Sequence, residues 1–390
     1  MIIHRVALGE SVYAIARKYS VSLLKLMGDN GLADGRLAVG EELLILKPTR
    51  EAPALLGDSV SKLALRFGVR KNSLYCLNPW IAGAEYLRPG QMLAVKASHP
   101  AYGTANALGI ARKETQKKRF KAALPFLTYV SLIEYRLSAS RLERCASLGE
   151  MRELARRHSR TVLLGIELDA SVLGGECSLD SLIRKMTELA KEGGDDGIYL
   201  KLTLGVCDRE LITKFMLALR RHLLGKDLIL VSEAEGGEAS EAIEISDGAT
   251  VRIEDISFGG DTAQGLIDFA SRNEALKCFV MPSYRVGGTD GGVSISGALR
   301  IARRMNKELC YRKENGTLTF DYGQFKGGRG ERIRTEIPSL QKVSDELRLA
   351  KELGYGGFAF DIEDTPISYF CIFNALFSRA DYISLTEEQS

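Results

Sequence analysis

From about residue 104 onward, short apolar segments alternate with amphipathic helical segments, and this alternation restricts the fold more than any other feature of the sequence. Eight such units over about 280 residues favour an α/β fold, the closed (β/α)8 or TIM barrel, over an open sheet. One stretch, about 308–338, has alternating residues and glycine turns instead, which predicts a small α+β insertion. The expected strands are 105–111, 127–135, 161–168, 196–203, 228–234, 249–256, 278–284 and 356–363.

The composition excludes several classes of function. With Lys+Arg 53 against Asp+Glu 50, the net charge of +3 is too balanced to indicate a nucleic-acid partner. No apolar run approaches the ~20 residues of a membrane span, and the N-terminus lacks the pattern of a signal peptide. The seven cysteines and four histidines are scattered, so we expect no disulfide framework, no metal site and no cofactor.

Two short repeats, 1–48 and 51–97, precede the alternating region. The segment "GESV" at 9–12 returns as "GDSV" at 57–60, and Asn30 returns as Asn78. Each repeat reads as strand, helix, helix and strand, with Ser11 or Ser59 as the N-cap of its first helix. The sequence therefore predicts two βααβ modules.

These residues resemble the LysM module, a family that binds polymers of N-acetylglucosamine, in peptidoglycan or chitin, between two loops. The resemblance implies peptidoglycan or a similar polymer as the partner, and two weak tandem sites would gain avidity. Trp80, the single tryptophan, is either a core residue of its module or a sugar contact. The implied glycan contacts are Gly9, Glu10, Ser11, Val12, Asn30, Gly31 and Leu32 in module one, and Gly57, Asp58, Ser59, Val60, Asn78, Pro79, Trp80 and Ile81 in module two.

The region 103–385 resembles the barrel of glycoside hydrolase family 18, and with the modules it is similar to spore cortex-lytic N-acetylglucosaminidases. The resemblance is carried by "LPFLTYVSLIEYRL", "DGIYLKL", "DRELITKFMLALRRHL", "VMPSY" and the late insertion, in that order. That family has a D-x-x-D-x-D-x-E motif on its fourth strand, whose last two acids protonate the leaving oxygen and orient the substrate's acetamido group.

On this sequence the motif positions are Asp196, Tyr199, Lys201 and Thr203, so only the first aspartate is kept. Threonine is no general acid near neutral pH, and a lysine would repel the cation that forms during the reaction. The tryptophans that the resemblance implies on strand eight and in the insertion fall at Asp361 and Arg334. We therefore expect a barrel without the family's catalytic acids. The fallback acids are Glu254, Asp255 and Glu363.

Alternation along strand 196–203 directs Lys201 towards the barrel interior, where an isolated charge would be costly. We expect a mutually neutralising network at the mouth of the barrel, which is a structural replacement for the catalytic pocket or, alternatively, a new catalytic site. Its expected members are Lys201, Arg252, Glu167, Glu254, Asp361 and Glu363.

Three hypotheses of function follow. The first is a glycan-binding protein whose hydrolase-like barrel is a scaffold. The second is an active glycosidase that uses the fallback acids, and the third is a protein that binds another small ligand in the mouth. The resemblance also implies synthesis in the mother-cell cytoplasm of a spore-forming bacterium and deposition on the spore surface or cortex.

Overall fold

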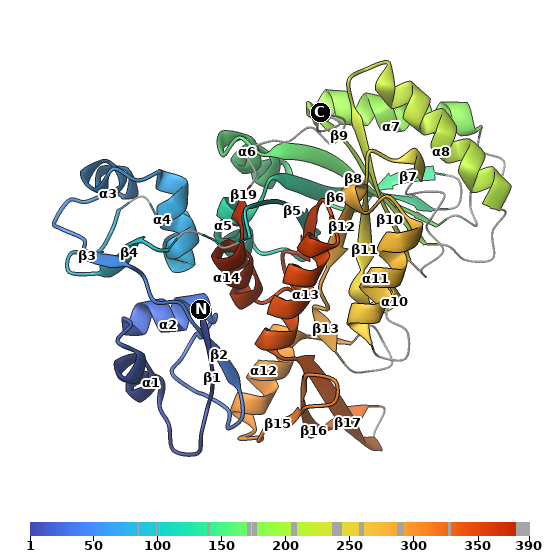
Figure 1. Cartoon of the computed structure of the whole chain (residues 1–390). Coiled ribbons are helices and arrows are strands. Elements are labelled where there is room, and N and C mark those ends of the chain that lie inside the picture. The colour runs from blue at the N-terminus through green and yellow to red at the C-terminus, as the bar shows by residue number, and fades with distance from the viewer. Residues whose placement is uncertain are drawn as a thin grey trace.

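The computed structural model describes residues 1–84, 86–98, 100, 102–138, 141–169, 173, 178–203, 209–235, 244–256, 261–286, 292–326 and 329–379. Two small N-terminal modules lie against one side of a larger barrel (Figure 1). Within the described ranges, no helix is both long and apolar enough to cross a membrane.

In each module two strands pair antiparallel, and two helices lie between them in the sequence. Module one consists of β1 (Ile2–Arg5), α1 (Val12–Tyr19), α2 (Leu23–Asp29) and β2 (Glu42–Ile45). Module two consists of β3 (Arg50–Pro53), α3 (Val60–Phe67), α4 (Lys71–Leu77), the short η1 (Pro79–Ile81) and β4 (Met92–Lys96).

The predicted helix N-caps are confirmed in both modules. The Ser11 hydroxyl accepts a hydrogen bond from the Ala14 N–H at 3.2 Å, and the Ser59 hydroxyl accepts one from the Lys62 N–H at 3.2 Å. Each cap satisfies an amide that the first helical turn leaves unpaired, and losing such a cap costs about 1 kcal/mol.

Eight parallel strands close into a barrel in the described part of the chain, as predicted. β5 pairs with both β18 and β6, and this closes the ring. In barrel order the strands are β5 (Thr104–Ala111), β6 (Tyr129–Ser138), β8 (Thr161–Asp169), β9 (Gly197–Thr203), β10 (Ile229–Glu235), β11 (Gly248–Arg252), β12 (Cys278–Met281) and β18 (Gly357–Asp361).

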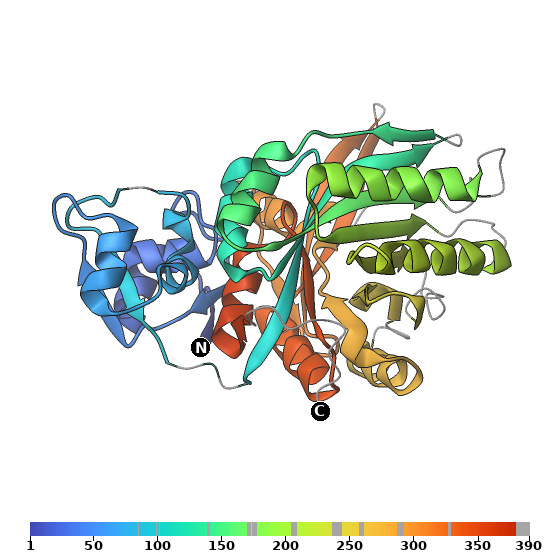
Figure 2. The ribbon, with the colours of Figure 1, turned by 90° about the horizontal axis from the view of Figure 1, so that it is seen from above.

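Helices cover the outside of the barrel (Figure 2). They are α5 (Lys117–Ala123), α6 (Gly149–Arg157), α7 (Leu179–Gly193), α8 (Arg209–Leu224), α10 (Ile253–Ile256), α11 (Thr262–Arg272), α12 (Ile295–Arg304), α13 (Leu340–Glu352) and α14 (Ile367–Leu376), with 3-10 turns η2 (Leu124–Phe126) and η4 (Ala275–Lys277). The shorter strands are β7 (Arg141–Arg144), β13 (Arg285–Val286), β14 (Val293–Ser294) and β19 (Ser378–Arg379). The insertion is a three-stranded antiparallel sheet of β15 (Cys310–Arg312), β16 (Thr317–Lys326) and β17 (Arg329–Pro338).

Successive side chains of β9 alternate between the outside and the inside of the barrel. Ile198, Leu200 and Leu202 are fully buried in an outer cluster with residues of α7 and α8. Tyr199 belongs instead to the inner cluster, with residues of β5, β6, β8, β10, β12 and β18. Lys201 is two residues further along the same strand and therefore shares the inward side.

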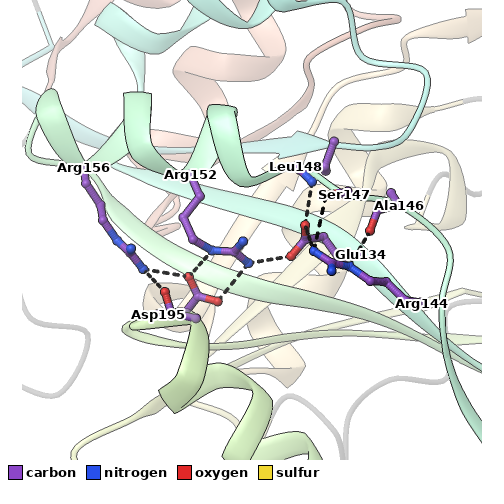
Figure 3. A network of polar contacts seen from close by, with 9 residues as sticks. Glu134, Arg144, Ala146, Ser147, Leu148, Arg152, Arg156 and Asp195 are labelled. Atoms are coloured by element: carbon purple, nitrogen blue, oxygen red, sulfur yellow. Dashed lines mark hydrogen bonds and ion pairs between the residues drawn. The ribbon is translucent and has the colours of Figure 1, made fainter.

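A buried ionic network lies in the barrel wall beside β6 (Figure 3). The strand has an irregularity between Ile133 and Tyr135, and Glu134 lies at this irregularity. The Arg152 guanidinium on α6 contacts the Glu134 carboxylate at 2.6 Å and the Asp195 carboxylate at 2.8 Å. Both carboxylates are almost fully buried, and Arg144 and Arg156 complete the compensation of their charge, at 3.4 Å from Glu134 and 3.3 Å from Asp195.

The modules are held to the barrel by buried polar contacts. Arg303 on α12 binds the carboxylate of Glu41 in module one, with Nε at 3.0 and 3.1 Å from its two oxygens. Next to this pair, the Leu309 N–H donates to the Val39 carbonyl at 2.8 Å. In module two the Asn72 amide donates to the Pro125 carbonyl at 2.9 Å and accepts from Arg160 at 2.9 Å.

The two modules and the barrel also meet at one ion pair. Lys25 and Asp29, one turn apart on α2, are 2.6 Å apart and almost completely buried. The Lys25 ammonium also donates to the Leu77 carbonyl of module two, and the Cys371 thiol on α14 is 3.9 Å from the Asp29 carboxylate. Burial raises the pKa of Asp29 to about 6, although Lys25 opposes this shift.

Arg303→Ala should lower the free energy of unfolding by about 3–5 kcal/mol, because it leaves the buried Glu41 carboxylate without its cation. Chemical denaturation of the full chain measures the effect. Arg304→Ala, which removes the neighbouring exposed arginine, is the matched control and should change stability by less than about 0.5 kcal/mol. Equal stability of the two variants would contradict a stabilising role for the Arg303–Glu41 ion pair.

Candidate functional site at the mouth of the barrel

Charged side chains lie at the C-terminal ends of the barrel strands, next to the inner apolar cluster. We call this set the mouth ring. The sign of the charge changes at every step from β6 to β11, and again from β18 to β5. In barrel order its members are Arg112 directly after β5, Arg136 on β6, Glu167 on β8, Lys201 on β9, Glu233 on β10, Arg252 on β11 and Asp361 on β18.

Neighbouring members of the mouth ring form ion pairs. An Arg112 nitrogen is 2.9 Å from the Asp361 carboxylate, and the Arg136 Nε is 3.0 Å from the Glu167 carboxylate. Asp361 is 2% exposed, and burial raises its pKa although Arg112 opposes the shift. The Arg136–Glu167 pair is more exposed and therefore contributes less to stability.

Glu233 is the most deeply buried acid of the mouth ring, at 1% exposure. The Arg252 nitrogens Nε and Nη2 donate to its Oε1 at 2.9 and 2.6 Å. The Tyr199 hydroxyl donates to Oε2, and burial together with the Glu233 charge raises the pKa of this tyrosine far above its usual value. Both carboxylate oxygens are thus engaged by the protein itself.

Lys201 lies between two of these acids. In the strand register, its partner on β8 is Glu167 and its partner on β10 is Glu233. Adjacent strands are about 4.8 Å apart and register partners point to the same side, so the half-buried lysine is flanked by a carboxylate on each side.

The structure brings four of the six expected network residues into the mouth ring, namely Lys201, Arg252, Glu167 and Asp361. Glu254 is elsewhere, because β11 ends at Arg252 and the chain turns into α10 before the expected strand end at Ile256.

Glu363 lies past the end of β18, where its carboxylate accepts the Gln116 N–H at 2.9 Å and is 4.0 Å from Arg119. Sequence reasoning missed Glu233, Arg112 and Arg136 as members. For Glu233 the signal was present, since alternation along 228–234 places it on the same side as Val231.

The remaining motif positions, the fallback acid Asp255 and the position of the expected tryptophan in the insertion are spread over the barrel. Asp196 lies at the opposite end of β9 from the mouth, where its carboxylate accepts the Val162 N–H at 2.7 Å. Thr203 is exposed at the C-terminal end of β9, in register with Asp169. Asp255 is exposed on α10, and Arg334 is exposed on β17.

The asparagine that recurs in both repeats forms hydrogen bonds inside its own module. The Asn78 amide donates to the Leu74 and Ala94 carbonyls at 2.8 Å, and its oxygen accepts the Ala94 N–H at 2.9 Å. Asn30 makes the same three bonds, with Leu26 and Leu44, in module one. These side chains join the second helix to the closing strand, so they shape the expected groove from within.

The acid of each first loop has a similar internal role. The Glu10 carboxylate accepts the Ala7 N–H at 2.8 Å, and the Asp58 carboxylate accepts the Leu55 N–H at 2.8 Å. Each bond closes the turn that contains Gly9 or Gly57, both of which have positive φ. Val12, Val60, Leu32 and Ile81 are buried, and Pro79 is buried in η1.

Trp80 is half-buried and packs on one side against the core of its own module. A Cβ on Gly28 of α2 would lie 2.0 Å from the indole Cε3, so the ring rests directly on this glycine. Trp80 therefore lies at the edge of its own module's core, as one of the two interpretations expected, and it also contacts the other module, which neither interpretation included.

Large apolar side chains are exposed beside the first loop of each module. Leu8 is 86% exposed and its repeat partner Leu56 is 90% exposed. In module two, Tyr86 is 69% exposed and bridges to Ser59 through the backbone. An exposed leucine and tyrosine next to loop amides form a surface that suits the apolar face of a sugar ring.

Comparison with known families assigns both repeats to one family. The LysM domain family matches residues 4–46 and 56–96. The two N-terminal modules are LysM domains. Among curated proteins, the chain is 24% identical over 243 residues to the Bacillus subtilis (strain 168) protein named "Putative sporulation-specific glycosylase YdhD", covering 59% of this chain and 57% of that protein.

A second relative matches a shorter stretch. The chain is 29% identical over 115 residues to the N-acetylmuramoyl-L-alanine amidase sle1 of Staphylococcus epidermidis, covering 27% of this chain and 35% of that protein. The chain thus spans between about a third and somewhat over half of the length of these curated relatives.

Solved structures share the fold, over the whole chain or part of it. The crystal structure of the Bacillus cereus spore cortex-lytic enzyme SleL superposes with a TM-score of 0.70 at 18% identity, covering 98% of this chain and 99% of that one. A Chromobacterium violaceum chitinase superposes with a TM-score of 0.59 at 14% identity, over 70% of this chain and 99% of that one. The expected barrel fold is therefore confirmed.

Lys201→Asp should lower the free energy of unfolding by about 3–5 kcal/mol, because three carboxylates would then lie side by side on β8, β9 and β10. Lys201→Met should lower it less, by about 1–2 kcal/mol, since Arg136 and Arg252 still bind the flanking acids. Denaturation at pH 7 measures both. Equal losses of stability in the two variants would contradict charge repulsion as the cause of the larger effect.

Proposed function

We propose that this protein binds peptidoglycan, or another polymer of N-acetylglucosamine, through its LysM domains and that its barrel is a non-hydrolytic scaffold. The LysM match and the exposed leucines and tyrosine beside the first loops support the binding. Relatives named for the spore cortex and for sporulation support deposition on the spore surface or cortex.

The composition of β9 carries the proposal of an inactive barrel. At the three inward positions where family 18 glycosidases need acids, the strand presents Tyr199, Lys201 and Thr203. The nearest buried acid, Glu233 on β10, has one oxygen bound by Arg252 and the other by Tyr199. A general acid must instead hold a transferable proton within reach of the substrate.

An assay of hydrolysis tests this part of the proposal. Incubation of the full chain with spore-cortex peptidoglycan and chitooligosaccharides should release no reducing ends above the level without protein. Release that is abolished by Glu254→Gln, Asp255→Asn or Glu363→Gln would establish the alternative, an active glycosidase with displaced acids. Release that survives all three substitutions would equally overturn the scaffold proposal.

A sedimentation assay with cortex sacculi tests glycan binding. The double variant Leu56→Ser/Tyr86→Ser should bind at least about tenfold more weakly, because burial of a leucine alone is worth about 1.5–3 kcal/mol. Leu224→Ser, which changes a 56%-exposed leucine on α8, is the control and should bind like the unaltered protein. Unchanged binding of the double variant would show that these loops are not the contact.

A further inference from the structure

The charge of the chain is unevenly distributed, although the net charge is only +3. Residues 104–160 contain 13 lysines and arginines against 5 acidic residues, whereas residues 161–390 contain 27 against 37. The positive excess of the barrel therefore lies at its beginning. A local excess of one sign attracts ligands of the opposite sign, whatever the net charge of the molecule.

Much of this excess is on three helices that lie together. α5 has four basic residues and no acidic one among its seven positions. α4 of module two begins with Lys71, and α6 ends with Arg157. The three helices meet at one small hollow beside module two (Figure 1). It is lined by residues of each, among them Tyr75, Lys121, Leu154 and His158.

We call the cations around this hollow the basic face. Its members are Lys71, Lys117 and Arg157, which are exposed, and Lys121, which is half-buried. The Lys71 ammonium is 5.9 Å from the centre of the Tyr75 ring, which is 6.5 Å from the His158 ring. A Cβ on Gly83 would be 2.5 Å from the Lys121 Cδ, so this side chain lies directly against module two.

Acids compensate only part of the basic face. Lys117 is 2.7 Å from the Glu150 carboxylate, and the Arg157 Nε is 3.0 Å from the Glu153 carboxylate. All four side chains are more than half exposed, so these pairs are weak and open to competition. Clustered like charges repel one another, and an anionic partner would relieve this repulsion.

Two pKa shifts indicate a positive potential at this surface. The hydrogen bond from Lys117 lowers the pKa of Glu150, and the charges of Lys117 and Lys121 act in the same direction. Burial lowers the pKa of His158, and the charges of Arg160 and Lys71 add to this effect. An acid is thus kept charged and a base kept neutral, as expected near an excess of cations.

The basic face begins beside the expected glycan contacts of module two. Gly83, which Lys121 contacts, is three residues from the exposed Tyr86. Three residues span at most about 11 Å, so a glycan strand on Tyr86 lies within reach of the basic face. Polymers of N-acetylglucosamine alone are uncharged and would gain nothing from these cations.

We propose that the basic face binds carboxylates of a glycan strand held by the second LysM domain, so that the ligand is carboxylate-bearing peptidoglycan rather than uncharged chitin. This inference rests on the proposed function and adds to it the charge of the polymer. Lysines suit such a ligand, because flexible point charges can follow carboxylates that have no single fixed position along the strand.

Sedimentation of the full chain with two forms of the same sacculi tests the inference. One form is native, and in the other the carboxylates are converted to amides. At about 0.05 M salt the native form should bind at least about tenfold more tightly, and at about 0.5 M salt this difference should almost disappear, because salt screens exposed charges. Equal affinity at low salt would overturn the inference and leave LysM binding intact. Binding of neither form would overturn the proposed function as well.

A charge-neutralised variant locates the effect. Lys71→Gln/Lys117→Gln/Lys121→Gln should bind native sacculi about tenfold more weakly at low salt. Its unchanged binding to the amidated form would show that it is folded. The matched control neutralises three exposed cations of α7 and α8, away from the modules (Figure 2). This control, Arg184→Gln/Lys185→Gln/Arg221→Gln, should bind both forms like the unaltered chain.

Two outcomes would contradict the assignment of the basic face. Equal losses in the two triple variants would show a general effect of net charge. Tighter binding of the full chain to duplex DNA than to native sacculi, at about 0.15 M salt, would assign the basic face to nucleic acid instead.

Discussion

In a closed barrel every strand is paired on both sides, so each inward side chain lies between inward side chains of the two neighbouring strands. No strand has a free edge at which a charged side chain could turn to solvent. At the mouth, where the apolar inner cluster ends, this constraint makes the charges of adjacent strands interdependent. Lys201 on β9 is acceptable because Glu167 and Glu233 flank it, and those acids are in turn bound by Arg136 and Arg252. A substitution that alters the charge on one strand therefore leaves a charged side chain on the neighbouring strand without its ion-pair partner.

The same constraint bears on chemistry. In a glycosidase of family 18, acids on one strand are held in readiness for a substrate, whereas here the acids of the mouth are bound by neighbouring strands. Each pair lowers the cost of burying its members and also occupies the oxygen atoms that a substrate would need. The ion pairs of the mouth ring are thus the observation on which the proposal of a non-hydrolytic barrel depends.

Sequence reasoning predicted the elements that depend on local periodicity. Alternation identified the barrel strands and directed Lys201, Arg252, Glu167 and Asp361 inward, and the repeat identified both caps. It failed where a strand ended early, as at Glu254, because alternation has no meaning once the chain turns into a helix.

Long-range contacts were beyond what periodicity can predict. The contact of Trp80 with Gly28 joins two modules, and the pair of Arg303 with Glu41 joins residues 262 positions apart. The recurrence of Asn30 and Asn78 likewise did not reveal the internal hydrogen bonds that join the second helix of each module to its closing strand.

The buried contacts of Arg303, Lys25 and Asn72 have a geometric consequence for any polymer that engages both LysM domains. The span between the first loops of the two domains is set by the fold and not by a flexible tether. A polymer strand that engaged both domains, as proposed, would have to present two sites at one fixed separation and orientation, so its repeat distance would matter as well as its chemical identity.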